Sequence, residues 1–206
     1  MTLSEALAPL YDSYLRRLDE MAARLNPGVV ISEAITRGED GRLLVADDGM
    51  PLRFDVADGR SGETFEVHGS RPDAPLASEL RAGSLSLRLE PGNWEELPVV
   101  CVYDGEPLPE DAEALADLLR AFAVFGGHGA FASARPSRGT GADRWSGRVH
   151  GVRVQLRENE LWAVFDLGSC PPVALESLTS ALAGYSDERV PLAWVKIGGP
   201  PPPPEL

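Results

Sequence analysis

The stretch LSLRLEPGNWEELPVVCVY, residues 85–103, decides the fold, because it holds two strand patterns separated by a turn. Residues 85–89 alternate leucine with polar side chains, which is typical of a strand with one solvated face. Residues 91–93 (Pro-Gly-Asn) form a turn. Residues 97–103 are nearly all apolar, as in a central strand, with Pro98 restricted to its start or to an edge.

A helix is predicted directly after this pair of strands, over residues 110–125. Its acidic first turn suits the positive end of the helix dipole, and its apolar residues recur at helical spacing. Residues 152–185 repeat the outline: alternation at 152–157, a short turn, an apolar strand at 161–167 and a second helix. The chain therefore contains two strand-turn-strand-helix units, near 84–127 and 152–185. They indicate either pseudo-duplication or one mixed sheet with helices on one face.

The N-terminal residues predict a long amphipathic helix. Thr2 and Glu5 have the spacing of a capping box, in which each side chain bonds to the backbone N–H of the other residue. Apolar residues then recur every three or four positions and form one stripe: Leu3, Leu7, Leu10, Tyr14, Leu18, Met21 and Leu25. The stripe either docks on the sheet of the same chain or forms a homodimer interface, and the sequence leaves both alternatives open.

Two hairpins are predicted next, one pairing residues 29–35 with 43–46 and one pairing 52–56 with 64–67, each across a polar loop that contains glycine. A last strand is predicted at 192–197. The fold class is therefore α+β: an N-terminal amphipathic helix followed by a mostly antiparallel sheet with two further helices.

The predicted domain organisation is one α+β domain over residues 1–199, followed by a proline-rich tail over 200–206. Residues 200–204 are all proline and cannot join a sheet or helix, so they form either a stiff solvated end or a segment that docks in an aromatic groove of a partner.

Charge is distributed unevenly along the chain. Residues 1–128 carry 24 Asp and Glu against 11 Arg, which accounts for the whole net charge of -13, because residues 129–206 carry 8 of each sign. Residues 90–117 hold nine acids and no base, and residues 135–157 hold six arginines and one acid. Such segregation bears on association rather than on chemistry. It disfavours a nucleic-acid partner, since phosphate contacts need a surplus of Lys and Arg, and suits a basic protein.

The acidic and arginine-rich stretches have two alternative roles. They either pair with each other inside the fold through cross-strand contacts, or form a dipolar surface that recruits a basic partner. For the second alternative we predict a partner-binding surface with an aromatic anchor and a set of acids: Trp94, Glu95, Glu96, Asp104, Glu106 and Glu110. Trp94 beside its turn is either that exposed anchor or a cap on the core.

No motif for catalysis, a metal or a cofactor stands out. His68, His128 and His150 have no partner at metal-ligand spacing, and no G-x-S-x-G segment offers a nucleophile elbow. Cys101 and Cys170 lie in or beside apolar strand-like segments, where we expect buried thiols, with a disulfide as the alternative. We therefore expect a protein that is not an enzyme and that has no metal site and no cofactor.

A weak anion-binding site is the alternative to this interpretation. Residues 137–144 are rich in glycine and arginine but lack the order of a P-loop, so a plain loop between strands is expected. If the protein is instead a small anionic-ligand binder or an enzyme, its site would gather Arg135, Arg138 and Arg144, together with His128.

The function expected from these observations is that of a non-catalytic acidic protein-binding module: an adaptor, a chaperone-like protein or an immunity-type inhibitor. In size, charge and outline the chain is similar to small acidic secretion chaperones and to acidic bacterial immunity proteins, an analogy that no motif carries. Its apolar runs are too short to span a bilayer and its N-terminus lacks the pattern of a secretory signal, so we expect a cytoplasmic protein without a membrane partner.

Overall fold

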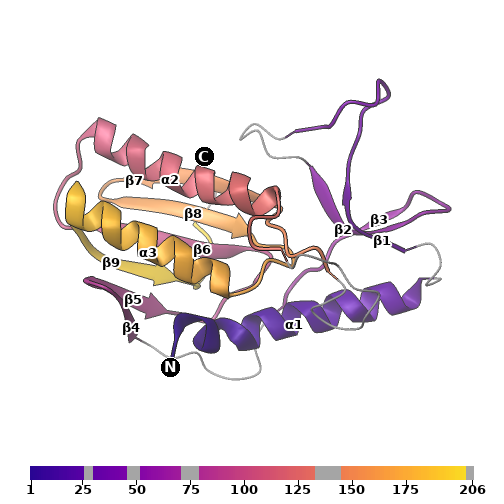
Figure 1. The fold of residues 1–206 in the computed structure, drawn as a ribbon, viewed down its shortest axis with the longest axis horizontal. Coiled ribbons are helices and arrows are strands. Elements are labelled where there is room, and N and C mark those ends of the chain that lie inside the picture. Colours follow the sequence, from indigo (N-terminus) through magenta and orange to yellow (C-terminus); the bar gives the residue numbers. More distant parts are fainter. Residues whose placement is uncertain (26–29, 46–51, 71–78, 133–144, 203–206) are drawn as a thin grey trace.

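The computed structural model describes residues 1–25, 30–45, 52–70, 79–132 and 145–202, which form an α+β fold (Figure 1). The helices are α1 (Leu3–Arg24), α2 (Pro109–Gly127) and α3 (Val173–Glu188). The larger sheet contains β4 (Glu79–Ala82), β5 (Leu85–Leu89), β6 (Leu97–Tyr103), β7 (Gly151–Arg157), β8 (Glu160–Asp166) and β9 (Leu192–Ile197). The smaller sheet contains β1 (Val30–Ile35), β2 (Arg53–Asp58) and β3 (Thr64–Phe65). The predicted fold class is confirmed.

α1 begins at the predicted capping box. Thr2 Oγ1 accepts from the Glu5 backbone N–H at 3.1 Å, and the Glu5 carboxylate accepts from the Thr2 N–H at 2.7 Å. The apolar stripe packs into the core of the same chain, where Leu7, Leu10 and Leu18 have no exposed surface. Of the two alternatives for the stripe, docking within the chain is the one observed, and these three leucines are not available to a homodimer interface.

The larger sheet has the strand order β4-β5-β9-β6-β8-β7. β5 and β9 are parallel, and the other neighbouring pairs are antiparallel. α2 and α3 lie side by side on one face of this mixed sheet (Figure 1). The two predicted units differ in their pairing, because β7 and β8 form a hairpin whereas β9 separates β5 from β6.

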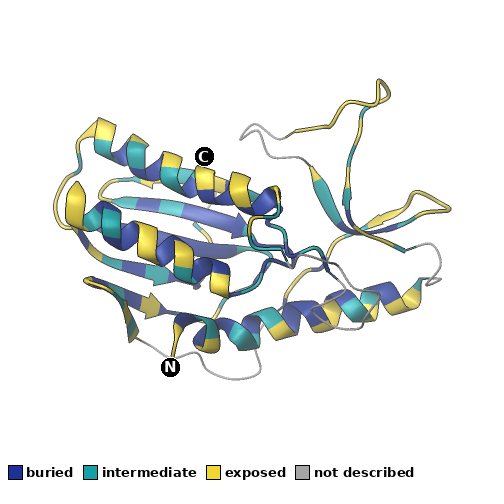
Figure 2. Ribbon diagram, in the orientation of Figure 1, coloured by how far each residue is buried: buried dark blue, intermediate teal, exposed yellow. Residues whose placement is uncertain are grey.

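The centre of the molecule is apolar. All seven residues of β6 are buried, and they lie between strands that are also largely buried (Figure 2). Leucines of both helices complete the core on one face. On the other face Arg88 stacks over the Trp194 ring at 4.3 Å and Lys196 over the Trp162 ring at 5.1 Å. Within the described residues, no helix combines the length and the apolar character needed to cross a membrane.

The smaller sheet has the order β1-β2-β3 and is antiparallel. The predicted hairpin between residues 29–35 and 43–46 is wrong, because β1 pairs along its length with β2 instead. Within the described part of the chain, only an isolated bridge, between Arg37 and Leu43, joins the segment after β1 to the predicted partner. The long separation between β1 and β2 hid this pairing, because the sequence favours the nearer segment. The pairing of residues 52–56 with 64–67 is confirmed in part by the β2–β3 ladder.

A projection extends from the smaller sheet, and we call it the arm: residues 36–45 together with Leu52 (Figure 1). At its base, backbone hydrogen bonds run from Thr36 N to Leu52 O, from Leu44 N to Thr36 O, and from Leu52 N to Leu44 O, each of 2.9–3.0 Å. The arm is therefore a hydrogen-bonded extension of the smaller sheet.

Candidate functional site

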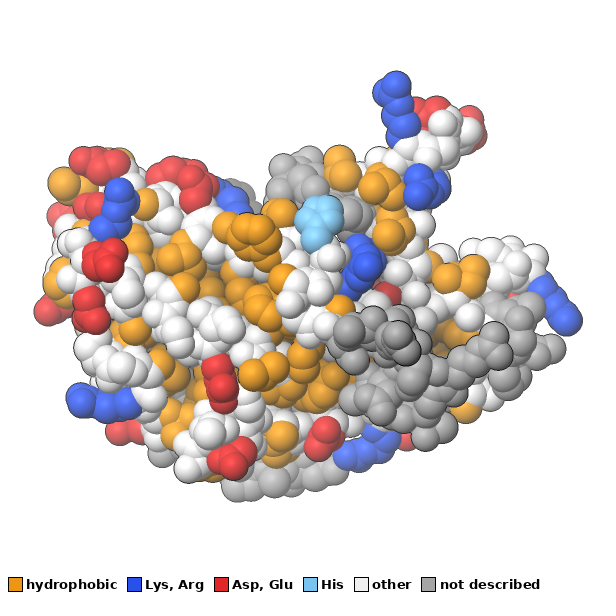
Figure 3. Space-filling model, viewed as in Figure 1, with side chains coloured by type: hydrophobic (Ala, Val, Ile, Leu, Met, Phe, Trp, Pro, Cys, Tyr) orange, Lys and Arg blue, Asp and Glu red, His pale blue; other side chains and the backbone are white. Residues whose placement is uncertain are grey.

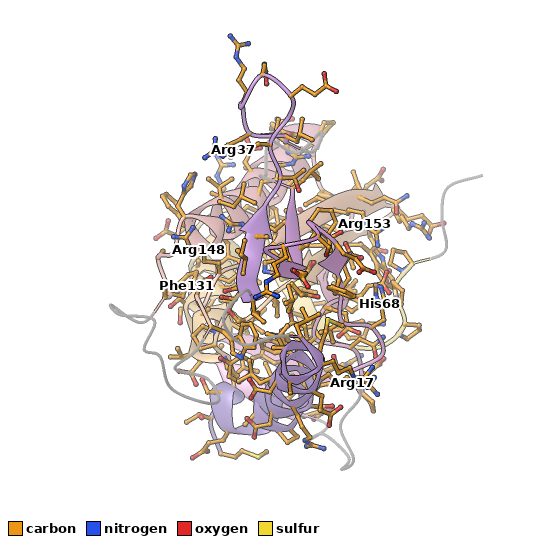
Figure 4. The ribbon with its side chains drawn as sticks, turned by 90° about the vertical axis from the view of Figure 1, so that its right-hand side faces the viewer. Arg17, Arg37, His68, Phe131, Arg148 and Arg153 are labelled. Carbon is orange, nitrogen blue, oxygen red and sulfur yellow. The ribbon has the colours of Figure 1, made fainter. Side chains whose placement is uncertain are left out.

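A cleft of about 560 Å³ lies where the two sheets meet. One wall comes from β2 and the segment after β3, and the other from β7, β8 and the turn before β6. The lining is rich in charge. Its titratable members are Arg53, Asp55, Glu66, His68, Glu95, Glu96, His150, Arg153 and Asp166. Figure 4 shows His68 and Arg153 on the same side of the smaller sheet.

His150 is the buried centre of a polar cluster at the back of this cleft. Its Nε2 lies 3.2 Å from Glu33 Oε1, and its Nδ1 lies 3.5 Å from Asp55 Oδ1 and 3.6 Å from Asp166 Oδ1. We call these four residues the His150 cluster. Glu33 and Asp55 come from the smaller sheet, whereas His150 directly precedes β7 and Asp166 ends β8, so the cluster joins the two sheets.

The register of β1 and β2 explains how two carboxylates reach one imidazole. Ser32 pairs with Val56 and Ala34 with Phe54, which places Glu33 opposite Asp55. Glu33 has a φ of 49°, a conformation that costs a non-glycine residue of order 1–3 kcal/mol. The strained backbone turns the one buried side chain of β1 toward His150.

Glu33 is held as a carboxylate. Burial alone would raise its pKa, but the hydrogen bond and the charge of His150 outweigh burial, with further hydrogen bonds from Ser146 and Ser169. The Ser146 N–H donates to Glu33 Oε2 at 2.5 Å, and Ser169 Oγ donates to Oε1 at 2.6 Å. The pKa of Glu33 falls to about 2 as a result.

The pKa of Asp55 is shifted upward, in the opposite direction to that of Glu33. Burial raises its pKa, and the neighbouring charge of Asp166 raises it further, although His150 and two hydrogen bonds oppose the rise. Those bonds come from the Tyr14 hydroxyl and from the Val67 N–H, both at 2.5 Å. Tyr14 is fully buried, and its pKa rises well above 10 through burial and then the charge of Asp55, so it stays a phenol.

The surroundings of His150 favour its imidazolium form. Burial opposes its charge, but Asp166, Glu33 and Asp55 together raise its pKa well above the ordinary 6.5. Both ring nitrogens then face carboxylates and neither has a free lone pair, so His150 cannot act as a general base in this state. Ser169 donates to Glu33 rather than to His150, so these residues do not form a serine–histidine pair.

The thiols offer no reactive group. Cys101 and Cys170 are free and buried, as predicted, and burial raises the pKa of Cys101 to about 12 and that of Cys170 well above its usual range. Across the described ranges, no three His, Cys, Asp or Glu side chains are placed to hold a metal ion.

The structure divides the predicted partner-binding residues. Glu95 and Glu96 line the cleft, where Glu95 accepts from the N–H and hydroxyl of Ser70, and Glu96 forms an ion pair of 3.0 Å with Arg153. Asp104, Glu106 and Glu110 lie beyond the other end of β6, about 20 Å away along a seven-residue strand. The predicted acidic residues therefore form two separate groups, and their role in partner binding stays a prediction.

Trp94 is a further correction to the predicted surface. Its side chain has 0% exposure, and its ring packs edge-on against Tyr11 with the centroids 5.5 Å apart. Of the two alternatives for Trp94, the cap on the core is the one observed, because the turn folds its indole inward rather than toward solvent.

The arginine-rich stretch is only partly visible. The predicted anion-binding residues Arg135, Arg138 and Arg144 lie outside the described residues. The 3.0 Å pair between Arg153 and Glu96 favours the internal alternative, in which the acidic and basic stretches contact each other.

The arm was missed as a functional feature by the sequence analysis. Leu43, Leu44, Val45 and Leu52 are 42%, 41%, 57% and 43% exposed, and Ile31 at its base is 51% exposed. Figure 3 shows hydrophobic side chains along the arm, facing others at the end of α2. The sequence signal for the arm was the run of three apolar residues, 43–45, directly after a polar turn. The predicted hairpin had placed these residues in a sheet.

No protein-family model matches the chain, and searches of curated proteins and of solved structures gave no match either.

Proposed function

We propose that this protein is a non-catalytic protein-binding module, an adaptor, chaperone-like protein or inhibitor, that docks through its arm and the adjoining cleft. The partner is a basic protein with an apolar groove that receives the arm. The observation that carries the proposal is the concentration of exposed large hydrophobics on a segment that projects from the body. Contiguous exposed apolar surface of this kind marks interaction sites in soluble proteins.

Charge supports the choice of a basic partner. Leu52 of the arm lines the same cleft as Glu66, Glu95 and Glu96, so acidic groups border the apolar surface. The net charge of -13 attracts a basic protein from a distance and raises its association rate.

The assignment as non-catalytic is supported by how the polar groups of the cleft are used. His150, the buried histidine of the cleft, is held between carboxylates. Glu96 is paired with Arg153, and Glu95 is bonded to Ser70. The two free thiols suit a reducing compartment, so we include a cytoplasmic location in the proposal.

The test begins with capture of partners from the native host at low salt, followed by identification and purification of the retained protein. Its affinity is then measured for the intact chain, for an arm variant (Leu43→Ser, Leu44→Ser, Val45→Ser) and for a control (Leu156→Ser, Val173→Ser) in which exposed apolar residues away from the arm are changed. We expect the arm variant to weaken binding at least about 100-fold, as hot-spot losses do, with the control unchanged. Equal affinity for the arm variant and the intact chain would overturn the proposal.

A pair of charge variants locates the electrostatic part of the interface. Glu95→Gln with Glu96→Gln removes two charges in the cleft, and Asp104→Asn with Glu106→Gln removes two at the other end of β6. The cleft variant should flatten the salt dependence of the association rate more than its counterpart. The same slope for both variants would contradict a partner seated at the cleft.

A further inference from the structure

Two arginine side chains converge on the turn that follows α2. Arg53 Nη2 donates to Gly127 O at 3.0 Å. Arg148 packs over Gly129, where a Cβ atom would stand 3.6 Å from its Nε and 3.8 Å from its Nη2. Both guanidinium groups therefore flank residues 127–129. Figure 4 shows Arg148 and Phe131 on the side of the smaller sheet opposite His68 and Arg153, whereas Arg53 also lines the cleft, so the location adjoins the cleft through Arg53.

Both side chains have an unused buried donor. The Nε atoms of Arg53 and Arg148 are buried and have no hydrogen-bond partner. Neither arginine forms an ion pair within 4.0 Å with a described carboxylate, in contrast to Arg120 and Arg153. A buried donor without a partner costs about 1–3 kcal/mol, and such donors in native proteins usually face a water or an ion.

The two positive charges also act on each other. Burial lowers the pKa of Arg53 and the charge of Arg148 lowers it further, while Glu33 opposes the decrease. α2 has no basic residue in its last turn, so one arginine at its carbonyl end serves the helix dipole. That role accounts for the bond from Arg53 to Gly127, but it explains neither the second arginine nor the two unused Nε donors.

We infer that Arg53 and Arg148 form a binding site for a phosphate group, carried by free phosphate or by a small phosphomonoester. Two guanidinium groups match the charge of about -2 on a phosphate, and their planar forks bond to its oxygens. His128 stands between the two glycines of the turn as a further polar neighbour. Phe125, on the last turn of α2 and 63% exposed, offers an apolar contact to the organic part of an ester.

The site goes beyond the proposed protein-binding function and does not depend on it. The experiment is calorimetric titration of the full chain with inorganic phosphate and with phenyl phosphate, at constant ionic strength. We expect saturable binding at one site per chain. Arg148→Gln should weaken it about 10-fold or more, since one charged hydrogen-bond donor pair is lost.

Matched variants keep the test interpretable. The Nε of Arg148 has no hydrogen-bond partner, so Arg148→Gln breaks no hydrogen bond at that atom, and a urea unfolding curve of the variant checks that it folds. Arg53→Lys retains the charge beside Gly127, and Arg120→Gln removes an equal charge from the exposed face of α2. Weakening in the Arg148 and Arg53 variants but not in Arg120→Gln supports the site. Tighter binding of phenyl phosphate supports a phosphomonoester, and equal affinities support free phosphate.

Two results would overturn the inference. One is the absence of saturable heat with either probe. The other is the same loss of affinity in Arg120→Gln and Arg148→Gln, which would show that the phosphate responds to overall charge rather than to these two guanidinium groups.

Discussion

β6 and β1 differ in how much of each strand is buried and in which side chains are buried. β6 is buried at all seven positions. β1 has one buried residue out of six, and that residue is Glu33. Figure 2 shows the same contrast between the largely buried larger sheet and the more exposed smaller sheet with its arm. The larger sheet is held by apolar burial, whereas the smaller sheet meets the rest of the molecule through the buried His150 cluster as well as through apolar contacts such as that of Val56.

The two sheets should also respond differently to pH and salt. Apolar burial depends little on pH and salt, whereas a buried ion cluster depends on the protonation of each member. The smaller sheet, which bears the arm, is therefore expected to open independently of the larger one.

The largest effect is expected from His150→Leu. Removing the imidazolium leaves Glu33 and Asp55 buried without their cation, which costs about 3–5 kcal/mol. Hydrogen exchange should show β1 and β2 opening while β6 stays protected, and urea unfolding should give the total loss. An equal increase in hydrogen exchange in both sheets would contradict the independent opening of the smaller sheet.

Leu161→Ala is the apolar counterpart in β8. Leu161 is 2% exposed, and its loss should lower the free energy of unfolding by about 2–5 kcal/mol through lost burial and a residual cavity. Here we expect protection in β6 and β8 to fall together with global stability. Selective opening of β1 in this variant would contradict the assignment of Leu161 to the shared core.

The pH dependence of stability should have two limits. Glu33 has a lowered folded pKa, so its contribution is complete above about 4.5 and is lost as the pH falls toward about 2, a decrease of roughly 3 kcal/mol. The raised pKa of Asp55 opposes part of this loss, since its protonation favours the folded state. The contribution of His150 is complete below 6.5 and is lost as the pH rises through its raised pKa. Urea midpoints from pH 2 to pH 10 should decline at both ends, and His150→Leu should flatten the profile.

Tyr14→Phe should give the smallest effect. The variant keeps the buried ring of α1 and removes one hydrogen bond to Asp55, for a loss of about 1–3 kcal/mol. It should also raise the pKa of Asp55, because a bond to the carboxylate form is removed. A carboxyl titration followed by NMR measures both, and an unchanged Asp55 pKa would show that the hydroxyl does not stabilise the carboxylate.

Local patterns predicted the elements whose contacts are close in sequence. The capping box of Thr2 and Glu5, the alternation at 85–89 and the helix near 110–125 are all observed. The pairing of β1 with β2 and the place of β9 were not predicted, because they join segments that are distant in the chain. β4 (Glu79–Ala82) was not predicted either, because it is a short edge strand with weak apolar character.

The candidate site was beyond sequence reasoning for a similar reason. Glu33, Asp55, His150 and Asp166 come from four strands or strand ends, and no local spacing relates them. The available signal in the sequence was one acid inside each of two short strands, Glu33 and Asp55. Burying such a charge costs free energy unless a partner is present. Glu95 and Glu96 were predicted only as members of a partner-binding surface, and the cleft that they line was not predicted.

The position of β9 has a consequence for biosynthesis. β9, the last strand among the described residues, fills the gap between β5 and β6, so neither neighbour is fully paired until residue 197 has left the ribosome. Nascent chains that stop before Leu192 expose two unpaired strand edges, one of them on the most apolar strand in the protein. The interval before β9 emerges is therefore a period of exposure to aggregation, and a rare-codon pause just before residue 192 should lower the soluble yield.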